Sequence, residues 1–596
     1  MSKILYFIAI VSFGAASFSS RVSAQGQQPF GGPVGAQGQQ GPDDDKEGPA
    51  EAAPTTKASL LPTTRVLPQP KNRKKRLDVF SIDGYFRWRG DWFKSFNLGY
   101  ISNPDDGGAP FPESLACQNQ ATTGTLCADS KALKSSNLRL RLEPVIHLNE
   151  KSSVHMQLDV LDNKVLGSDP NGLTLDGSAR PGNVPISGLT DGQVASGQTL
   201  LVKRAWAEIV TPVGLLKFGR MPWHWGLGIS ANASGYDPIH DTYDLDGDYG
   251  DNVDRLSMAA LIPGTELEAS VAMDWVSTSP TADQTDAFAN TQRGQPWDLE
   301  DHDDVNQWVF TLARMDSPLD IENKLANGEW VLNYGGFLAY RTQDWEQANV
   351  RLGEAPPSED FVVRELEIYQ PDFWLRLAKG NMNFEMEGTA YLGNIANLSD
   401  LGVTGDVNIR SFGGVARLDY RVLDQKLLIQ GEVGYASGDQ FDNSPEGATH
   451  VSNSVLFPPS PNDNTISAFR FDFGYNIDLI LFRELLGTVT NATYIKPKVR
   501  YDINENFYVS GQTVLSIANN KVSTPGNGNF YGLELDADAG FQSDGYFAGV
   551  AYGVFFPMSA MSHPPGSEFG FTAQNSDDFI TQERAQTIQF RMGLKF

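Results

Sequence analysis

The sequence has no long hydrophobic run beyond its first two dozen residues. Nothing after residue 24 offers the roughly 18 uncharged apolar residues that a membrane-spanning helix requires. Positive charge is also scarce: 46 Lys and Arg stand against 73 Asp and Glu, which gives a formal net charge of −27. Because phosphate binding needs clustered Lys and Arg, this balance argues against nucleic acid as a partner.

Cysteine and histidine are sparse as well. Cys117 and Cys127 are too far apart for a CxxC redox pair, and no His or further Cys lies nearby to complete a zinc site. In an exported chain they predict one disulfide that closes a small loop. The seven histidines are scattered and match no nucleophile or zinc motif, so we expect no enzyme. A hydrolase whose Ser–His pair is assembled across strands stays open as an alternative.

The first 78 residues predict two segments without a folded core. Residues 1–24 have the form of a secretory signal peptide, with Lys3 before a short apolar stretch and the small residues Val22-Ser23-Ala24 at the cleavage site. Residues 25–78 are rich in Gln, Gly, Pro and Ala and poor in apolar side chains. They are predicted to be a disordered periplasmic tail.

From residue 79 to residue 596, apolar and polar side chains alternate. In the last strand the apolar set is Ile588, Phe590, Met592, Leu594 and Phe596. Successive side chains of a strand point to opposite faces, so one face is apolar and the other polar. A strand between lipid and a water-filled lumen has this pattern. The edge strand of a soluble sandwich is the alternative.

Repetition of this pattern predicts the fold class. We count 18 such segments, joined alternately by turns of a few residues and by loops that often exceed 20 residues. Short periplasmic turns that alternate with long external loops are typical of transmembrane barrels. Residues 79–596 are therefore predicted to form an all-β, antiparallel transmembrane β-barrel of 18 strands, with 16 or 20 as alternatives.

The stretch between Asp439 and Asn491 does not fit the strand pattern. Residues 478–486 have helical periodicity, with an apolar face. We predict a loop outside the barrel wall that carries a short helix folded in over the pore mouth. The competing interpretation is a broken outward strand in a larger barrel.

Charged residues at lumen-facing positions form two sets of candidate pore-lining side chains. The first is a basic wall on adjacent strands, made up of Arg87, Arg89, Arg139 and Arg141. The second is acidic and lies on other strands: Glu266, Glu268, Glu385, Glu387, Asp536 and Asp538. Opposed charges across a water-filled constriction create a transverse field that orients dipolar solutes. The alternative is that these residues form the ordinary solvated pairs of any polar lumen.

The segment DPIHDTYDLDGDYGDNVDR is predicted to be an external loop and a candidate calcium site. Its aspartates surround two glycines: Asp244, Asp246, Asp248 and Asp251. Oxygen-rich loops bent by glycine suit Ca²⁺, which would be a structural ion and the one cofactor expected. The loop is no EF-hand, because Arg255 stands where that motif has its Glu. The alternative is a hydrated acidic surface loop.

Several segments carry a resemblance to a known family. GYFRWRGDWF, VKRAWAEIVTPVGLLKFGRMPWHWGLG, DGDYGDNVDR, GYASGD and DLILFRELLGTVTNATYIKP resemble a family of large, uncharacterised Gram-negative outer-membrane barrel proteins. More distantly, the strand count and the arginine-lined lumen are similar to porins and alginate-export channels. A terminal Phe596 resembles the signal that the barrel assembly machinery reads. The resemblance implies a location in the bacterial outer membrane.

These patterns favour an outer-membrane channel for small hydrophilic solutes. Its expected partners are outer-membrane lipids, the barrel assembly machinery and the solutes themselves. The main alternative is a barrel occluded by the 439–491 loop that serves as a surface receptor, adhesin or scaffold. An outer-membrane hydrolase is a third candidate.

Overall fold

The structure is a computed structural model that describes most of the chain after residue 78. The described residues are 79–98, 101–102, 132–165, 200–237, 242–244, 246–247, 250–278, 300–347, 361–398, 405–439, 464–524, 526, 528–543, 545–562, 571–572 and 582–596. The predicted signal peptide (residues 1–24) and the predicted tail (residues 25–78) lie outside this set.

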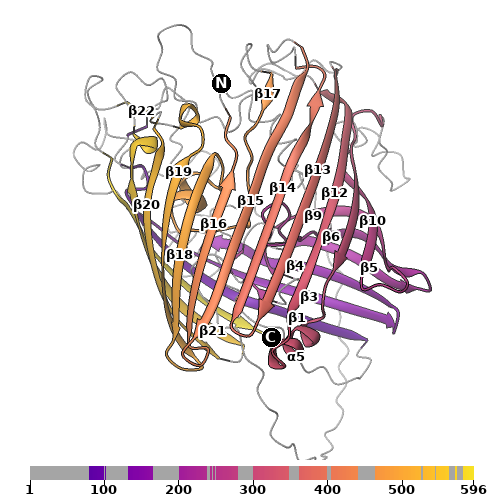
Figure 1. Cartoon of the computed structure of the whole chain (residues 1–596), viewed down its shortest axis with the longest axis horizontal. Coiled ribbons are helices and arrows are strands. Elements are labelled where there is room, and N and C mark those ends of the chain that lie inside the picture. The colour runs from indigo at the N-terminus through magenta and orange to yellow at the C-terminus, as the bar shows by residue number, and fades with distance from the viewer. Residues whose placement is uncertain are drawn as a thin grey trace, which may run out of the picture.

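Eighteen strands of the described residues form the wall of a closed antiparallel barrel, as predicted (Figure 1). In chain order they are β1 (Phe80–Lys94), β3 (Ala132–Asn149), β4 (Ser152–Val165), β5 (Leu200–Thr211), β6 (Gly214–Pro222), β9 (Asn252–Leu261), β10 (Glu268–Ser277), β11 (Val305–Arg314), β12 (Val331–Gln347), β13 (Phe361–Lys379), β14 (Met382–Ile395), β15 (Val407–Val422), β16 (Leu427–Ala436), β18 (Ala492–Asp502), β19 (Phe507–Ala518), β20 (Phe530–Ser543), β21 (Tyr546–Pro557) and β23 (Ala585–Lys595). Each wall strand pairs with the next, and β1 closes the barrel against β23.

The remaining described elements are short and are not part of the wall. They are β2 (Ile101–Ser102), β7 (Tyr236–Asp237), β8 (Thr242–Tyr243), the helix α5 (Pro318–Ala326), β17 (Thr465–Ile466), the π-helical turn η5 (Leu481–Leu485), the 3-10 turns η6 (Lys521–Ser523) and η7 (Ser559–Met561), and β22 (Phe571–Thr572). β17 pairs in parallel with two residues of β15, which makes it the nineteenth strand of the sheet. The described part of the 439–491 segment, residue 439 and residues 464–491, contributes no strand to the wall, as predicted, and the alternative of a broken wall strand in a larger barrel is wrong.

Helix α5 was not predicted from the sequence. It lies at the end of the barrel that carries the short turns, between β11 and β12 (Figure 1). Ser317 caps its start, because the Ser317 hydroxyl accepts a hydrogen bond from the amide of Asp320, and Pro318 suits the first helical turn. Gly328 follows the helix with a φ of +71°, a conformation that glycine adopts without strain. These local signals were present in the sequence, but the strand pattern on either side concealed them.

The two ends of the wall meet along β1 and β23. Ten residue pairs join these strands, from Tyr85 opposite Lys595 to Lys94 opposite Gln586. Two further backbone hydrogen bonds of 3.0 Å connect Gly84 with Phe596. A Cβ atom on Gly84 would lie 2.3 Å from the carbonyl oxygen of Arg141 and 3.1 Å from the Phe596 ring, so this close approach requires glycine.

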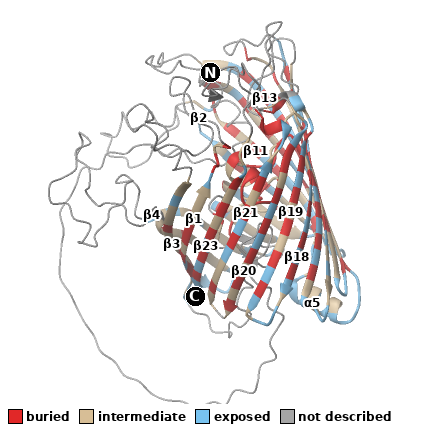
Figure 2. Cartoon of the chain, turned by 90° about the vertical axis from the view of Figure 1, so that its left-hand side faces the viewer, coloured by how far each residue is buried: buried red, intermediate tan, exposed pale blue. Residues whose placement is uncertain are grey.

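Buried and exposed residues alternate along the wall strands (Figure 2). Large apolar side chains on the outer face remain about half exposed, for example Phe310 at 50%, Leu418 at 45% and Phe590 at 46%. An apolar surface that encircles a barrel requires lipid around it. Together with an even strand count and alternating short turns and long loops, this surface is that of a bacterial outer-membrane β-barrel. Among the described helices, none is long and apolar enough to cross a membrane.

Candidate functional site in the barrel lumen

Strands β1 and β3 bring the four predicted arginines to one side of the lumen. Arg87 lies opposite Arg139 across the strand pair, and Arg141 lies opposite Tyr85. With Arg89, these residues are at most 8% exposed. Their placement follows from the alternation, because the intervening residues face lipid.

Carboxylates on neighbouring strands neutralise part of this basic wall. Asp159 on β4 receives two hydrogen bonds from Arg141, of 2.6 and 2.8 Å, and is fully buried. Asp162 on the same strand pairs with Arg139. Lys203 on β5 completes the group, 3.0 Å from Asp159 and 3.1 Å from Asp162. Sequence reasoning missed these aspartates as partners, although the alternation along β4 places Asp159 on the lumen face.

The predicted acidic residues do not all line the lumen. Glu385, Glu387, Asp536 and Asp538 are buried on the inner faces of β14 and β20. Glu268 begins β10 and is exposed at the end of the barrel that carries the short turns. Glu266 was predicted to lie in a strand, but it lies in the turn before β10, where its 76% exposed side chain pairs with Arg314 at 2.6 Å. That prediction was wrong because Thr265 turns the chain: its hydroxyl accepts a hydrogen bond from the amide of Leu267.

The described part of the loop between β6 and β9 bends into the lumen instead of extending outward. We call these described residues the first inner segment: 223–237, 242–244, 246–247 and 250–251. Glu387 holds it from the wall, because its Oε2 atom accepts hydrogen bonds from the amides of Leu227 and Gly228, the second at 3.0 Å. Gly226 has a φ of +55°, and a Cβ atom there would lie 2.5 Å from the Glu387 carboxylate. Glycine is therefore needed for this close approach.

A second loop, between β16 and β18, also occupies the lumen. We call residues 464–491 the second inner segment. Glu534 on β20 accepts hydrogen bonds of 2.8–2.9 Å from three consecutive amides, those of Leu479, Ile480 and Leu481. Asp478 accepts two more, both 3.0 Å long, from Phe482 and Arg483. Two carboxylates thus satisfy the amides at the start of the π-helical turn η5, which would otherwise be buried without partners.

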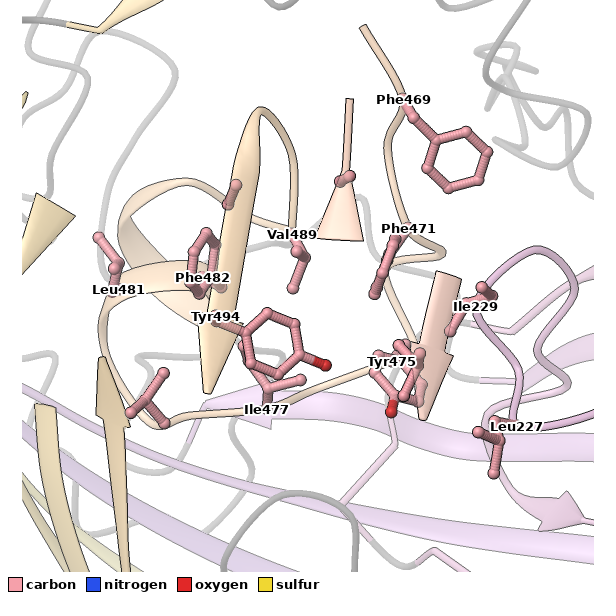
Figure 3. Packing of buried hydrophobic residues seen from close by; sticks show 14 of the residues in the cluster. Leu227, Ile229, Phe469, Phe471, Tyr475, Ile477, Leu481, Phe482, Val489 and Tyr494 are labelled. Atoms are coloured by element: carbon pink, nitrogen blue, oxygen red, sulfur yellow. The ribbon is translucent and has the colours of Figure 1, made fainter. Parts of the chain in front are cut away.

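The two inner segments pack against each other (Figure 3). The amide of Asp472 donates a 2.8 Å hydrogen bond to the carbonyl of Ile229 and so joins their backbones. Around this contact lies an apolar cluster that includes Leu227, Ile229, Phe469, Phe471, Tyr475, Ile477, Leu479, Leu481, Phe482 and Val489. The helix predicted over the pore mouth is therefore η5, and it lies within this packed cluster. The apolar content of the first inner segment could have indicated its burial, because an external loop has no reason to carry it.

A pair of acidic side chains lies where the segments meet. Asp251 of the first inner segment shares a side-chain hydrogen bond with Asp472 of the second. Burial raises the pKa of Asp251 to about 6, even though Arg204 and Arg341 lie close enough to favour its charge. Burial, and then the charge of Asp251, raise the pKa of Asp472 well above its usual range. A single proton shared between the two carboxylates accounts for the raised pKa of both groups.

The predicted calcium loop has a different arrangement. Asp246 points among arginines: its carboxylate lies 2.6 Å from Arg591, 2.6 Å from Arg483 and 3.5 Å from Arg89. Burial alone would raise the pKa of Asp246, but these guanidinium groups hold it well below its usual range. Asp248 lies outside the described residues. Within the described part of the chain, no three acidic, His or Cys side chains are placed to hold a metal ion. The described residues of the loop therefore form no calcium site, because arginines take up the charge of Asp246.

Cys117 and Cys127 lie outside the described residues, so the disulfide stays a prediction.

Comparisons with known proteins show likeness at the level of structure. No family model and no curated protein matches the chain. The chain is similar to OpdK of Pseudomonas aeruginosa with vanillate, at 9% identity over 87% of this chain and 98% of that one, with a TM-score of 0.38. It is also similar to OccAB2 of Acinetobacter baumannii, at 9% identity, 87% and 98% coverage and a TM-score of 0.39. A loop-deletion mutant of the outer-membrane protein OmpT of Vibrio cholerae gives 8% identity, 87% and 100% coverage and a TM-score of 0.32. Because these TM-scores are so low, the assignment of the fold rests on the strand pairings of this chain and not on the likeness to these structures.

Proposed function

We propose that this protein is an outer-membrane channel for small hydrophilic solutes, narrowed by its two inner segments. The observation that carries the proposal is the contrast between the faces of the wall: apolar side chains outside, and charged or amide side chains such as Arg417, Gln430 and Lys496 inside. A polar interior is the arrangement of barrels that conduct water and solutes. Its partners would be outer-membrane lipids and, during insertion, the barrel assembly machinery.

The charges of the lumen would set the selectivity. The basic wall of β1 and β3 is joined by Arg591 on β23, while β14 and β20 carry the buried acidic residues. Fixed opposite charges at the walls of a narrow aqueous path orient dipolar solutes and reject apolar ones.

A second candidate function has an observation of its own. Ile229, Phe469 and Leu479 are fully buried inside the lumen, as in the core of a globular domain. A lumen filled to this degree suits an occluded barrel that acts as a surface receptor, adhesin or scaffold. Whether a path through the lumen remains open to solutes decides between the channel and the occluded barrel.

A hydrolase is less well supported. Ser153 lies 2.9 Å from Nε2 of His155, and Glu208 lies 3.9 Å from the same ring nitrogen. In a Ser–His–acid triad the acid holds the other nitrogen and so orients the ring toward the serine. The three side chains therefore do not form that arrangement.

Swelling of proteoliposomes tests the channel directly. Purified protein is reconstituted into liposomes and diluted into isotonic solutions of uncharged sugars of increasing size, with protein-free liposomes as the control. A channel gives swelling that is fastest for the smallest sugar and falls with size. Absence of swelling with every sugar would favour the occluded barrel.

A further inference from the structure

Three cationic residues share the outer face of the barrel where β1 closes against β23, at the end that carries the long loops. Lys94 is the last residue of β1, Lys134 is the third residue of β3, and Arg584 directly precedes β23. β1 lies between β3 and β23 in the sheet (Figure 2). All three residues are exposed. Lys94 shares its face with Phe86, and Arg584 shares its face with Phe590, both of which face lipid.

The strand register makes these three residues neighbours. Lys134 lies directly opposite Trp92, and Lys94 is two residues beyond Trp92 on β1. Lys94 in turn lies opposite Gln586, and Arg584 is two residues before Gln586. Diagonal neighbours on one face of an antiparallel pair have Cα atoms about 7–8 Å apart. The cations therefore form a line across three strands, with Lys94 in the middle.

The tilt of the strands places this line at one depth in the membrane. A single row of the sheet joins Leu140 in the middle of β3, Phe86 on β1 and Leu594 near the end of β23. Rows therefore run toward the short turns on passing from β3 to β23. The three cations step the other way, toward the long loops, so their line offsets the tilt. A molecule that lies flat on the membrane surface can contact all three.

The line follows the border between the apolar band and the headgroups of the outer leaflet. On the side toward the short turns, β1 and β23 present Phe86, Trp92 and Phe590 outward. Tyr552 on β21 lies at the border, and its hydroxyl donates a 3.0 Å hydrogen bond to the side chain of Gln586. Trp and Tyr are enriched where a membrane meets water. Because the long loops of such barrels are external, this border belongs to the outer leaflet.

The positive charge of the line is not balanced by the described part of the chain. Within the described ranges, none of the three cations forms an ion pair with a carboxylate. The outer face of β6 offers a contrast, because Arg220 there is neutralised by Asp254 at 2.6 Å. Like charges at neighbouring positions of a sheet destabilise it. We therefore expect the counter-charge to come from the surroundings of the barrel.

We propose that Lys94, Lys134 and Arg584 bind the phosphate groups of a glycolipid in the outer leaflet of the outer membrane. A headgroup with two phosphates pairs with the line of cations, while its acyl chains cover Trp92 and Phe590. Such a lipid spans β3, β1 and β23, and so covers the strand pair that closes the barrel. The proposal depends on the location of the barrel in the outer membrane and not on the proposed channel function.

Binding of diphosphoryl lipid A to the purified barrel tests the site. Native mass spectrometry of the protein in a non-ionic detergent, titrated with this lipid, gives the affinity. A cation near an anionic membrane surface contributes a factor on the order of fivefold to such binding. Lys94→Gln/Lys134→Gln should therefore weaken binding about 25-fold, and Arg584→Gln alone about fivefold.

Two further variants separate the site from net charge. Lys151→Gln/Lys426→Gln removes two exposed lysines from short turns at the other end of the barrel, so it changes the net charge equally and should bind as the wild type does. Lys94→Arg/Lys134→Arg keeps both charges and should also retain binding. Heat-modifiable migration on gels confirms that each variant is assembled. If Lys94→Gln/Lys134→Gln fails to assemble, Arg584→Gln decides, because residue 584 lies outside the wall strands.

A second lipid distinguishes the glycolipid from any anionic lipid. Phosphatidylglycerol carries one phosphate on a smaller headgroup, so it should bind more weakly and depend less on Lys94 and Lys134. Equal affinity for lipid A in the wild type and in Lys94→Gln/Lys134→Gln, or an equal loss in the Lys151→Gln/Lys426→Gln control, would overturn the site. Phosphatidylglycerol that binds as tightly as lipid A, through the same lysines, would overturn the glycolipid as its ligand. None of these measurements requires conduction.

Discussion

At the residue scale, the position of Phe596 separates a role in the stability of the folded barrel from a role in its assembly. The residue is 54% exposed at the end of the barrel that carries the short turns, and its backbone is paired with Gly84. A ring at the membrane interface contributes little to stability, since even a charge there costs only about 0–1 kcal/mol. A strong requirement for Phe596 would therefore reflect recognition during assembly.

We predict that Phe596→Lys lowers the amount of assembled protein in cells far more than it lowers refolding of purified protein into detergent. Phe590→Lys is the control on the same strand, because it places a charge in the middle of the lipid face at a cost of roughly 2–4 kcal/mol and should impair both processes. Heat-modifiable migration on gels measures assembly in each case. Normal assembly of Phe596→Lys in cells would refute its role as a signal.

The positions of the four arginines show what could be predicted at this scale. Arg87 and Arg139 alternate with apolar neighbours, so their lumen-facing side follows from local sequence alone. The residues with which these arginines form ion pairs do not follow from local sequence. Arg591 meets Asp246 across 345 residues of sequence, and no local pattern signals such a contact.

At the scale of elements, the inner segments depend on carboxylates in the wall. Glu387 binds the amides of the first, Glu534 those of the second, and Asp251 and Asp472 lie between them. The sequence predicted Glu387 as a pore-lining charge, but its role as an anchor depends on the bend at Gly226. Periodicity identifies the face of a strand, whereas the path of a loop depends on contacts with distant parts of the chain.

The pair of Asp251 and Asp472 predicts a pH dependence. A carboxyl with a pKa of about 6 in the folded protein, against about 3.9 when unfolded, binds its proton more tightly in the folded state. The contact is therefore most stable below about pH 4 and weakens as the pH rises through about 6. Hydrogen exchange of the amide of Asp472, corrected for its intrinsic rate, should show less protection at pH 8 than at pH 5.

Asp472→Asn is the matching variant for this prediction. It keeps a hydrogen-bonding side chain but removes one of the two charges, so the protection should vary much less between these pH values. A variant as pH-dependent as the wild type would assign the effect to other groups.

At the scale of the whole molecule, the strand count and the closed barrel were predictable because each spanning strand repeats the same two-residue pattern. The filling of the lumen was only partly predictable. Helical periodicity in residues 478–486 indicated an inserted turn, but the loop that carries DPIHDTYDLDGDYGDNVDR was expected outside. Trp225, Leu227, Ile229, Ala231 and Ala233 recur at every second position, which is the period of a strand, so periodicity could not indicate a segment folded into the lumen. Their burial follows from packing against the second inner segment.

The central claim is that this barrel is a channel whose path is narrowed by its inner segments. Single-channel conductance in planar bilayers tests it most directly, with the wild-type protein compared with a variant in which a short Gly/Ser linker replaces residues 465–490. We predict small, steady steps for the wild type and steps several-fold larger for the variant, because the apolar cluster loses eight of the ten residues named above. A silent wild type beside a conducting variant would contradict the claim and identify an occluded barrel.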